Sequence, residues 1–299
     1  MTVQIERSTK ARIAPAGLVF LAITSIGWGL NWPIVKYVLT EWPPLSARGL
    51  TGIVGGGLLA LLAAWRGQSF AVLRGQWPRL LLSAFLNVTT WMTLMGLALV
   101  WLPASEAAVI AYTMPVWASL LAWLVLGERV SITRILALVM AFAGIAALMG
   151  GNGFEASMEK LPGIVMVLVG AFAFALGTIV AKRLPVKMPL IASSALQIGI
   201  GCVPVALAGL LFEHPRLEAL STTGWALMAY MTVIQFCVAY VCWFAALERL
   251  PASVAAIGTM AVPVIGVVAS AVALHEPLGL GQIAALLFTL AGVALATRS

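Results

Sequence analysis

Charge is what this sequence has least of. Asp, Glu, Lys and Arg together make up 9% of the 299 residues, whereas a soluble domain carries roughly 25%. Hydrophobic residues make up 62%, and a water-soluble fold of this length cannot bury so much apolar surface in one core. This composition excludes an ordinary soluble enzyme and a disordered chain. The sequence therefore predicts a membrane protein that crosses the bilayer many times.

Residues that bind metals or act as nucleophiles are also scarce. Cys202, Cys237 and Cys242 fall inside apolar stretches, and His214 and His275 fall in expected loops. No Cys-x-x-Cys or Cys/His spacing typical of a metal site occurs, and no Walker-type phosphate loop occurs. We therefore expect no metal, no cofactor and no catalytic residues, so the chain is not predicted to be an enzyme.

The charge that is present is mostly positive, with a formal net charge of +7. In a soluble protein such a charge would suggest nucleic acid as a partner. Basic residues of membrane proteins, however, collect in cytoplasmic loops. The expected partners are the lipid bilayer and a small-molecule, amino acid-like substrate, with no nucleic acid, and a monomer is expected.

Ten apolar runs without Asp, Glu, Lys or Arg fill nearly the whole chain. A helix needs about 20 apolar residues to cross the hydrocarbon layer, and most of the runs have about this length. The strict alternation of a β-barrel strand is absent. The sequence therefore predicts an all-α membrane protein with ten transmembrane helices. The runs are 13–35, 49–65, 80–105, 107–127, 135–154, 161–181, 188–212, 219–247, 250–274 and 277–297.

The basic residues predict the orientation. If the ends of the helices are assigned alternately to two sides, the side of the N-terminus receives 13 Lys and Arg residues. The opposite side receives 4, namely Lys36, Arg48, Lys160 and Arg216. The positive-inside rule then places both termini in the cytoplasm. Residues 1–12 are polar and basic, and the apolar run after them is too long for a signal peptide, so they are expected to form a cytoplasmic tail.

An internal repeat divides the chain into two halves. LPASEAAVIAYTMPV, from Leu102, matches LPASVAAIGTMAVPV, from Leu250, at an offset of 148 residues, and Ala143-Gly144 matches Ala291-Gly292 at the same offset. Each half contains five apolar runs, and because five is odd the second half enters the membrane from the opposite side. The sequence therefore predicts two inverted five-helix repeats, 13–149 and 161–297, joined by an external linker at 150–160. Inverted repeats are typical of secondary transporters.

The residues at these positions also resemble a known family. Gly27-Trp28-Gly29-Leu30-Asn31-Trp32-Pro33-Ile34-Val35-Lys36 is similar to the WGxNxxxxK start of the drug/metabolite transporter superfamily, in its EamA-type branch of ten-helix exporters. Pro115-Val116, Leu126-Gly127-Glu128 and Gly144 are similar to its PV…LGE…G pattern. Pro263-Val264, Glu276 and Gly292 repeat that pattern, with His275 in place of the usual Gly. Within the branch, the chain most resembles bacterial aromatic amino acid exporters. The resemblance implies a site near mid-membrane, surrounded by helices 1, 3, 4, 6, 8 and 9.

Polar and aromatic side chains at mid-depth are candidates for that site, because polar groups in a membrane tend to face an interior cavity. Asn87 and Trp91 share a face of helix 3, and Tyr240 and Trp243 share a face of helix 8. Aromatic walls with a few polar groups would suit an amphiphilic ligand. Hydrogen bonding between helices and interfacial belts are the alternative roles. The candidate substrate-binding residues are Asn31, Lys36, Asn87, Trp91, Glu106, Tyr112, Gln197, Gln235, Tyr240 and Trp243.

Charged residues near the helix ends leave two interpretations open. Lys36 can hold a carboxylate or extend to the lipid headgroups. Glu106, the only carboxylate within an apolar span, can attract an amine or reach the outer interface. Glu128 and Glu276 occupy corresponding loop ends, and we interpret them as structural residues that pair with bases or helix ends.

Small residues and prolines predict close packing and bends. Gly52 and Gly56, and the series Gly163, Gly170 and Gly177, have the spacing that brings helix backbones together. Pro115 and Pro263 occupy equivalent mid-helix positions, where each removes a backbone hydrogen bond. They are candidate hinges, with static kinks as the alternative.

These patterns predict a secondary transporter of the bacterial inner (plasma) membrane. It would export amino acids, foremost aromatic and other large neutral ones, or similar small metabolites by alternating access. A proton-coupled drug/metabolite antiporter, a channel and a membrane-embedded enzyme are the alternatives. Because only Glu106 enters a span among the ten acidic residues, the sequence favours export down the substrate gradient without obligatory proton exchange.

Overall fold

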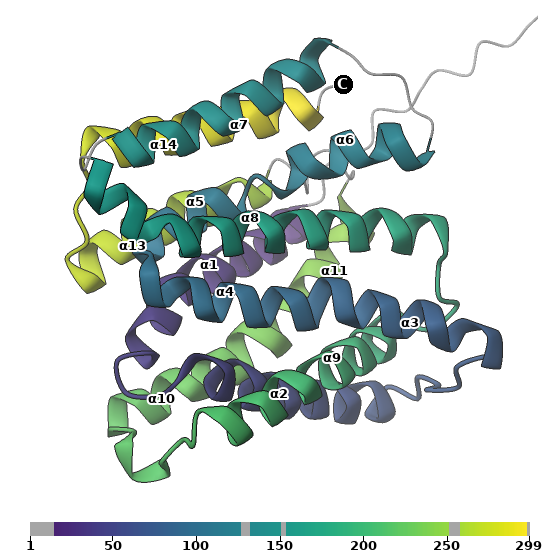
Figure 1. Cartoon of the computed structure of the whole chain (residues 1–299). Coiled ribbons are helices and arrows are strands. Elements are labelled where there is room, and N and C mark those ends of the chain that lie inside the picture. Colours follow the sequence, from purple (N-terminus) through teal and green to yellow (C-terminus); the bar gives the residue numbers. More distant parts are fainter. Residues whose placement is uncertain (1–14, 127–131, 151–153, 251–257, 298–299) are drawn as a thin grey trace, which may run out of the picture.

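A computed structural model describes residues 15–126, 132–150, 154–250 and 258–297. All regular structure in these ranges is helical (Figure 1). Six helical stretches are long and apolar enough to cross a membrane by length and composition, and shorter apolar helices accompany them. The main helices are α1 (Pro15–Val38), α2 (Pro44–Trp65), α3 (Trp77–Ala84), α4 (Thr90–Trp101), α5 (Ala104–Ala111), α6 (Met114–Leu126), α7 (Ile132–Gly150), α8 (Phe154–Arg183), α9 (Leu190–Phe212), α10 (Thr222–Tyr230), α11 (Ala239–Arg249), α13 (Ala261–Leu274) and α14 (Leu280–Thr297).

The two halves repeat one arrangement with inverted direction, as the sequence predicts. The second helices of the halves, α2 and α9, pack together, and so do the fifth helices, α7 and α14, which lie along the opposite edge of the bundle (Figure 1). The first helix of each half packs against the fourth helix of the other half: α1 contacts α13, and α8 contacts α6. Each first helix also contacts the third helix of the other half, α1 with α11 and α8 with α4. The contacts between first and fourth helices and between first and third helices therefore each occur twice, while α2–α9 and α7–α14 each join equivalent helices of the two halves.

The third helix of each half contains a π-helical segment. In the first half, η2 (Phe85–Thr89) joins α3 to α4, and in the second half, η4 (Met231–Val238) joins α10 to α11. Such bulges are frequent at functional sites. The fourth helix of the first half is interrupted between α5 and α6, where Pro115 follows the break. In the second half, Pro263 lies near the start of α13.

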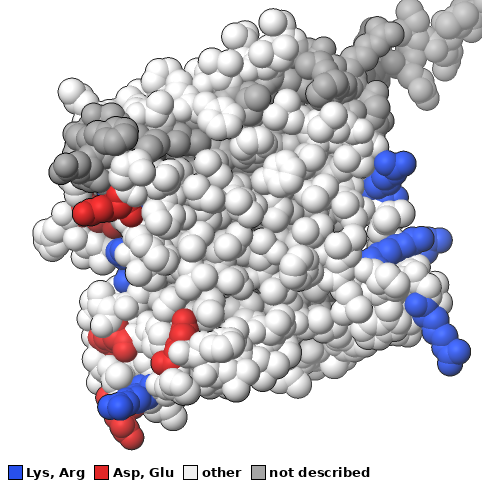
Figure 2. Space-filling model, viewed as in Figure 1, with Lys and Arg blue, Asp and Glu red and all other residues white. Residues whose placement is uncertain are grey.

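The two ends of the bundle differ in charge. One end, here called the basic end, carries Arg66, Arg74, Arg79 and Lys187, and the amide of Lys187 donates to Gln76 Oε1 there, at 2.9 Å. The other end, here called the acidic end, carries the glutamates 41, 213, 218 and 276. In Figure 2, Lys and Arg extend from one end of the molecule, and the glutamates gather at the other end beside a few basic groups.

Glutamates at the acidic end bind the starts of helices. Glu213, after α9, accepts from the amides of Leu45 and Ser46 at the start of α2. Glu276, after α13, accepts from the amides of Ala104 and Ser105 at the start of α5, at 2.6 and 2.9 Å. A carboxylate at a helix start satisfies unpaired N–H groups and interacts favourably with the helix dipole. The structural role predicted for Glu276 is confirmed, and Glu128 lies outside the described residues.

Glycines allow the closest contacts, as their spacing predicts. Gly52 and Gly56 of α2 lie against Cys202 and Gly199 of α9. The three glycines of α8 face the third helix of the first half: Gly163 contacts Leu102 and Ala98, Gly170 contacts Met95, and Gly177 contacts Asn87. A Cβ atom at most of these positions would overlap a neighbouring residue.

The start of α2 departs from the sequence prediction. The second apolar run was expected to begin at residue 49, which left Arg48 among the loop residues of the outer side. The structure instead begins α2 at Pro44, so Arg48 lies in its second turn. Only 3% of Arg48 is exposed. The prediction was wrong because a charged residue ends an uncharged run, although a buried arginine does not end a helix.

Candidate functional site: a cavity between the repeats

A cavity of about 570 Å³ lies between the two repeats. Ligand pockets commonly occupy about 300–1,000 Å³, so this cavity has room for a molecule the size of an amino acid. Helices of both halves contribute to its lining. The lining residues are Trp28, Asn31, Trp32, Val35, Arg48, Trp91, Met92, Met95, Leu99, Tyr112, Met114, Pro115, Ala118, Phe174, Ala175, Thr178, Gln235, Tyr240, Trp243, Thr259, Met260, Pro263, Thr289 and Leu290.

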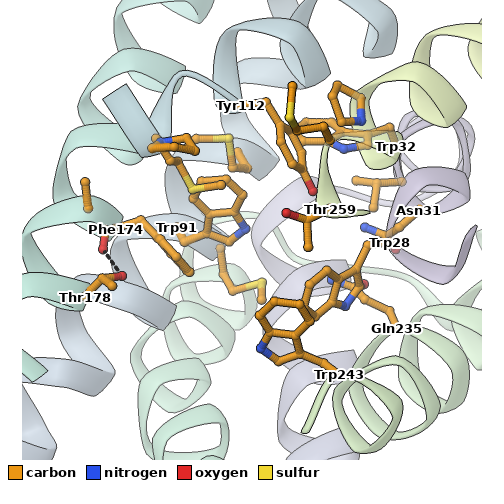
Figure 3. A pocket seen from close by; sticks show the side chains of 18 of the residues that line it. Trp28, Asn31, Trp32, Trp91, Tyr112, Phe174, Thr178, Gln235, Trp243 and Thr259 are labelled. Carbon is orange, nitrogen blue, oxygen red and sulfur yellow. Dashed lines mark hydrogen bonds between the residues drawn. The ribbon is translucent and has the colours of Figure 1, made fainter. Parts of the chain in front are cut away.

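Aromatic pairs form two facing walls. Trp91 and Phe174 lie on one side of the cavity, with ring centroids 5.1 Å apart (Figure 3). On the other side Trp28 contacts Tyr240 edge-on at 5.4 Å and Trp243 at 5.8 Å. The walls correspond in the repeat, because each pairs the first helix of one half with the third helix of the other. Two such walls can receive a flat apolar group between them.

The break in the fourth helix opens onto the cavity between these walls. Tyr112, the last residue before the break, points toward Thr259 of the second half (Figure 3). Met114 and Pro115, the first residues of α6, line the cavity, and so does Pro263 of α13. Broken helices at a repeat interface are typical of transporter binding sites.

Four buried polar side-chain atoms in the lining have no hydrogen-bond partner. They are Asn31 Oδ1, Arg48 Nε, Gln235 Oε1 and Thr289 Oγ1. Buried polar groups are usually hydrogen-bonded, and leaving one unpaired costs about 1–3 kcal/mol. An amphiphilic ligand in the cavity would supply the missing partners.

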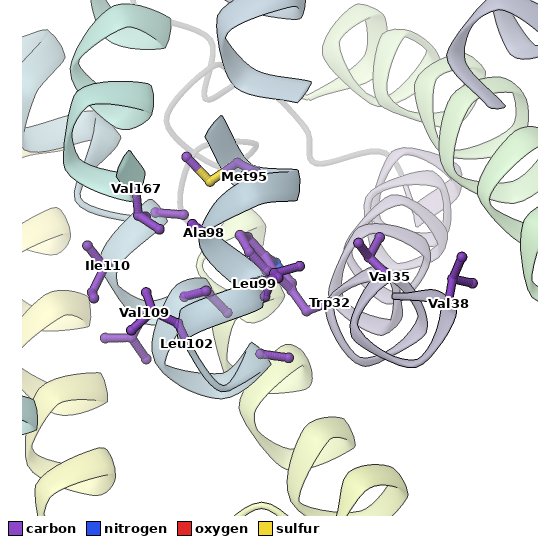
Figure 4. Close-up of a cluster of buried hydrophobic side chains, with 14 of the residues drawn as sticks. Trp32, Val35, Val38, Met95, Ala98, Leu99, Leu102, Val109, Ile110 and Val167 are labelled. Atoms are coloured by element: carbon purple, nitrogen blue, oxygen red, sulfur yellow. The ribbon is translucent and has the colours of Figure 1, made fainter. Parts of the chain in front are cut away.

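A cluster of buried apolar side chains borders the cavity (Figure 4). It joins α1, α4, α5 and α8, and Trp32, Val35, Met95 and Leu99 belong both to the cluster and to the lining. Toward the basic end, Thr178 of α8 lines the cavity and is exposed.

Eight of the twelve residues that the sequence singles out line this cavity. They are Asn31, Trp91, Tyr112, Gln235, Tyr240, Trp243, Pro115 and Pro263. The structure thus gathers residues from six helical segments around one space. Lys36, Asn87, Glu106 and Gln197 are not among the lining residues.

Lys36 reaches the end of a neighbouring helix. Its Nζ donates to the carbonyl oxygens of Leu99 and Leu102, the latter at 2.9 Å, where α4 ends. The last carbonyls of a helix lack intrahelical partners and carry partial negative charge. This contact is neither of the two roles that the sequence left open, carboxylate binding and contact with lipid headgroups.

Glu106 forms an ion pair away from the cavity. Lys160 Nζ lies 2.8 Å from Glu106 Oε1, and Gln282 donates to the same oxygen at 3.3 Å. Glu106 is only 2% exposed. The contacts join α5, α8 and α14, so this carboxylate is satisfied by helices of both halves.

Asn87 and Gln197 lie at helix interfaces. Asn87 packs against Gly177, and Gln197 donates to Ser193 Oγ one turn away. Asn87 corresponds in the repeat to Gln235, at the offset of 148 residues, yet only Gln235 lines the cavity.

Several lining residues were not predicted as candidates. Arg48 is the only charged side chain among the described residues of the lining, whereas the sequence predicts it in a loop. Trp28 and Phe174 complete the aromatic walls, and Thr259 and Thr289 contribute hydroxyl groups. The repeat offers a signal for Phe174, since the first helix of each half carries an aromatic residue opposite Trp91 or Tyr240. Within the described residues no three His, Cys or Glu side chains gather as a metal site would require.

Comparison with known proteins identifies the fold. A model of the EamA-like transporter family matches residues 15–150 and 161–298, once for each repeat. The chain belongs to this family. A solved crystal structure, which is 21% identical, covers 95% of this chain and 98% of its own, with a TM-score of 0.66. That likeness supports the ten-helix EamA architecture.

Members of the EamA family similar to this chain are transporters. The uncharacterized transporter YvbV of Bacillus subtilis is 32% identical over 93% of this chain and 90% of its own length. A Salmonella typhimurium protein named "probable amino-acid metabolite efflux pump" is 27% identical and covers 92% of each chain. An Escherichia coli protein with the same name is also 27% identical and covers 87% of each chain. The chain is therefore a multi-pass membrane transporter of the EamA type.

Proposed function

We propose that this transporter exports amino acids, foremost aromatic and other large neutral ones, or similar small metabolites, across the bacterial inner membrane by alternating access. The observation that carries this proposal is the aromatic-walled cavity at the repeat interface, which contains unpaired polar atoms. An aromatic amino acid would place its ring between the walls and its polar end against those atoms. The efflux pumps among the relatives agree with this substrate class.

The charge of the two ends supports an orientation for the transporter in the membrane. The basic end would face the cytoplasm, since Lys and Arg collect there in membrane proteins. In that orientation the apolar cluster would lie on the outer side of the cavity, and the exposed Thr178 would lie on the cytoplasmic side. This arrangement suits an exporter in the state that loads substrate.

Accessibility to a membrane-impermeant thiol reagent tests this orientation. Glu159→Cys, in the predicted outer linker, is expected to react in intact cells, because residue 159 is exposed near the acidic end. Ser69→Cys, which is exposed at the basic end, is expected to react only after the cells are opened. A background without Cys202, Cys237 and Cys242 removes the native thiols. Reaction of Ser69→Cys alone in intact cells would contradict the orientation.

The site supports export down the substrate gradient without obligatory proton exchange. A proton-coupled carrier usually keeps a carboxylate or histidine inside the membrane to carry the proton. Of the residues that the structure describes, no Glu or His lines the cavity. Glu106, the buried carboxylate of α5, forms an ion pair with Lys160 instead.

Liposomes with a trapped pH dye test both the substrate class and the coupling. Protein-dependent efflux of phenylalanine is expected to proceed without stoichiometric proton movement. Efflux by Glu106→Gln is likewise expected to proceed without it. Glu159→Gln, an exposed position on the same side, serves as the control. Stoichiometric proton movement that Glu106→Gln abolishes would instead establish the proton-coupled antiporter. Transport of sugars with none of amino acids would contradict the substrate class.

A channel and an enzyme fit the cavity less well. A channel has no need of inverted repeats with prolines at equivalent positions, although it can contain them. An enzyme would need a nucleophile with a base, or a metal cluster, at the site. Within the described part of the chain, the lining contains no His, Cys or Glu to fill those roles.

A further inference from the structure

Arg48 is an unusual residue for the interior of a membrane protein. It lies in the second turn of α2, is 3% exposed and lines the cavity. Its side chain passes Gly96 of α4, where an added Cβ would lie 3.2 Å from Arg48 Cγ. Gly96 therefore leaves space for the side chain on its way to the cavity. A charged side chain at membrane depth is costly and is commonly a functional residue.

Among the described residues, no carboxylate balances the charge of Arg48. Its Nε is buried without a hydrogen-bond partner. Across the described parts of the chain, no acidic residue lines the cavity, and the buried carboxylate of Glu106, away from the cavity, pairs with Lys160. An uncompensated buried charge is strongly destabilising. An anionic group of a ligand would supply the partner, and a guanidinium binds a carboxylate through two parallel hydrogen bonds.

Two helix starts add to the positive character of the cavity. Met114 and Pro115 begin α6, a helix of 13 residues, and line the cavity. Met260, the N-cap of α13, a helix of 14 residues, also lines it. Helix N-termini carry partial positive charge, and half-helix N-termini meet anionic substrate groups in other transporters. Arg48 and both helix starts therefore favour the same sign of ligand charge.

A ligand ammonium group would meet only neutral partners. Asn31 Oδ1, Gln235 Oε1 and Thr289 Oγ1 are the unpaired oxygens of the lining. An amide can present its oxygen to an ammonium or its NH₂ to a hydroxyl or carbonyl group. Neutral partners of this kind accept an ammonium but do not select for it.

We propose that Arg48 binds the carboxylate of the substrate, and that the cavity requires this carboxylate while an ammonium group is dispensable. This proposal rests on the proposed function and specifies its substrate class as aromatic carboxylates, with or without an amino group. A monoanion leaves no net charge beside Arg48, whereas a zwitterion leaves one positive charge. Aromatic acids without an amino group are therefore expected to bind at least as tightly as the amino acids.

Three related ligands test the proposal on the purified full-length protein. They are L-phenylalanine, 3-phenylpropanoate, which lacks the amino group, and 2-phenylethylamine, which lacks the carboxylate. Competition against radiolabelled phenylalanine gives their relative affinities. We expect 3-phenylpropanoate to compete at least as well as phenylalanine. We expect 2-phenylethylamine to be weaker by about 10- to 100-fold, since a hydrogen bond to a charged group is worth about 1.5–3 kcal/mol.

Variants of Arg48 separate substrate binding from a structural role. Arg48→Met is expected to weaken phenylalanine binding by about 10- to 100-fold without lowering the melting temperature of the empty protein, because it removes an unpaired buried charge. Arg48→Lys keeps the positive charge but cannot form the bidentate pair of hydrogen bonds with a carboxylate, so an intermediate affinity for phenylalanine is expected. Arg66→Gln, at the exposed end of the same helix, is the matched control and is expected to bind normally.

The outcomes distinguish this proposal from the proposed function. If phenylalanine binds but 2-phenylethylamine competes equally well, or Arg48→Met binds phenylalanine normally, the role of Arg48 is refuted while amino acid transport stands. A fall in melting temperature for Arg48→Met, with unchanged selectivity between the ligands, would make Arg48 a structural residue. If none of the three ligands binds the wild-type protein, the proposed function itself fails.

Discussion

Trp91→Ala is expected to lower the rate of phenylalanine transport by about tenfold while leaving the protein folded. Trp91 and Phe174 form one wall of the cavity, with ring centroids 5.1 Å apart. An aromatic contact adds about 0.5–1.5 kcal/mol beyond the burial of apolar area, and the substitution removes such a contact between the wall and the substrate ring. Tyr240→Ala, in the facing wall, is expected to have a similar effect.

Radiolabelled uptake into liposomes, beside size-exclusion profiles of each variant, measures this effect. Trp65→Ala is the matched control, because Trp65 is 83% exposed at the end of α2 and lies outside the cavity. Wild-type rates in both Trp91→Ala and Tyr240→Ala would refute the role of the aromatic walls.

Gly49→Ala is expected to destabilise the protein by about 3 kcal/mol, near the upper end of the usual cost of overpacking. At this position α2 crosses α9 so closely that an added Cβ would lie 2.4 Å from the backbone nitrogen of Ala206. Gly209 meets Ser46 in the same way, with its added Cβ 2.5 Å from the Ser46 nitrogen. The helices must separate to accept a methyl group, since backbone atoms cannot turn aside as a side chain can.

Thermal unfolding of the purified protein in detergent measures this loss. Gly57→Ala, in the same helix, is the matched control, because an added Cβ at residue 57 meets nothing within 4 Å. Its stability is expected to be unchanged or slightly higher, as alanine favours helix more than glycine does. Equal melting temperatures for both variants would contradict the close crossing of α2 and α9.

The architecture could be predicted from the sequence because it depends on long-range regularities of composition. Apolar runs give the helices, and the match between the segments from Leu102 and Leu250 gives the repeat. An odd number of helices in each half then requires inversion. Each of these signals extends over many residues, so no single side chain decides them.

The roles of individual charged residues depend on partners that lie far away in the sequence. Glu106 meets Lys160 after 54 residues and Gln282 after 176, and no local pattern marks either contact. Lys36 finds the carbonyls at the end of α4 for the same reason. Asn87 and Gln235 correspond in the repeat but differ in environment, since Asn87 packs against Gly177 of α8 and Gln235 lines the cavity.

Arg48 is a charged residue inside a helix, and a search for runs without charged residues places it outside the helix. Such a search ends each predicted helix at the nearest charged residue. The structure instead begins α2 at Pro44, four residues before Arg48. Proline is favoured at the first turn of a helix, so the Pro43-Pro44 pair was a local signal for the earlier start. With that start the arginine falls inside the span.

The most direct test of the account is counterflow of phenylalanine in liposomes that contain the purified protein. Vesicles preloaded with unlabelled phenylalanine are placed in a trace of the labelled compound. We expect transient, saturable accumulation of label by the wild-type protein and much lower accumulation by Arg48→Met and Trp91→Ala, because a carrier returns with substrate in the cavity between its repeats. Flux that does not saturate and shows no counterflow, or equal accumulation by all three proteins, would contradict it.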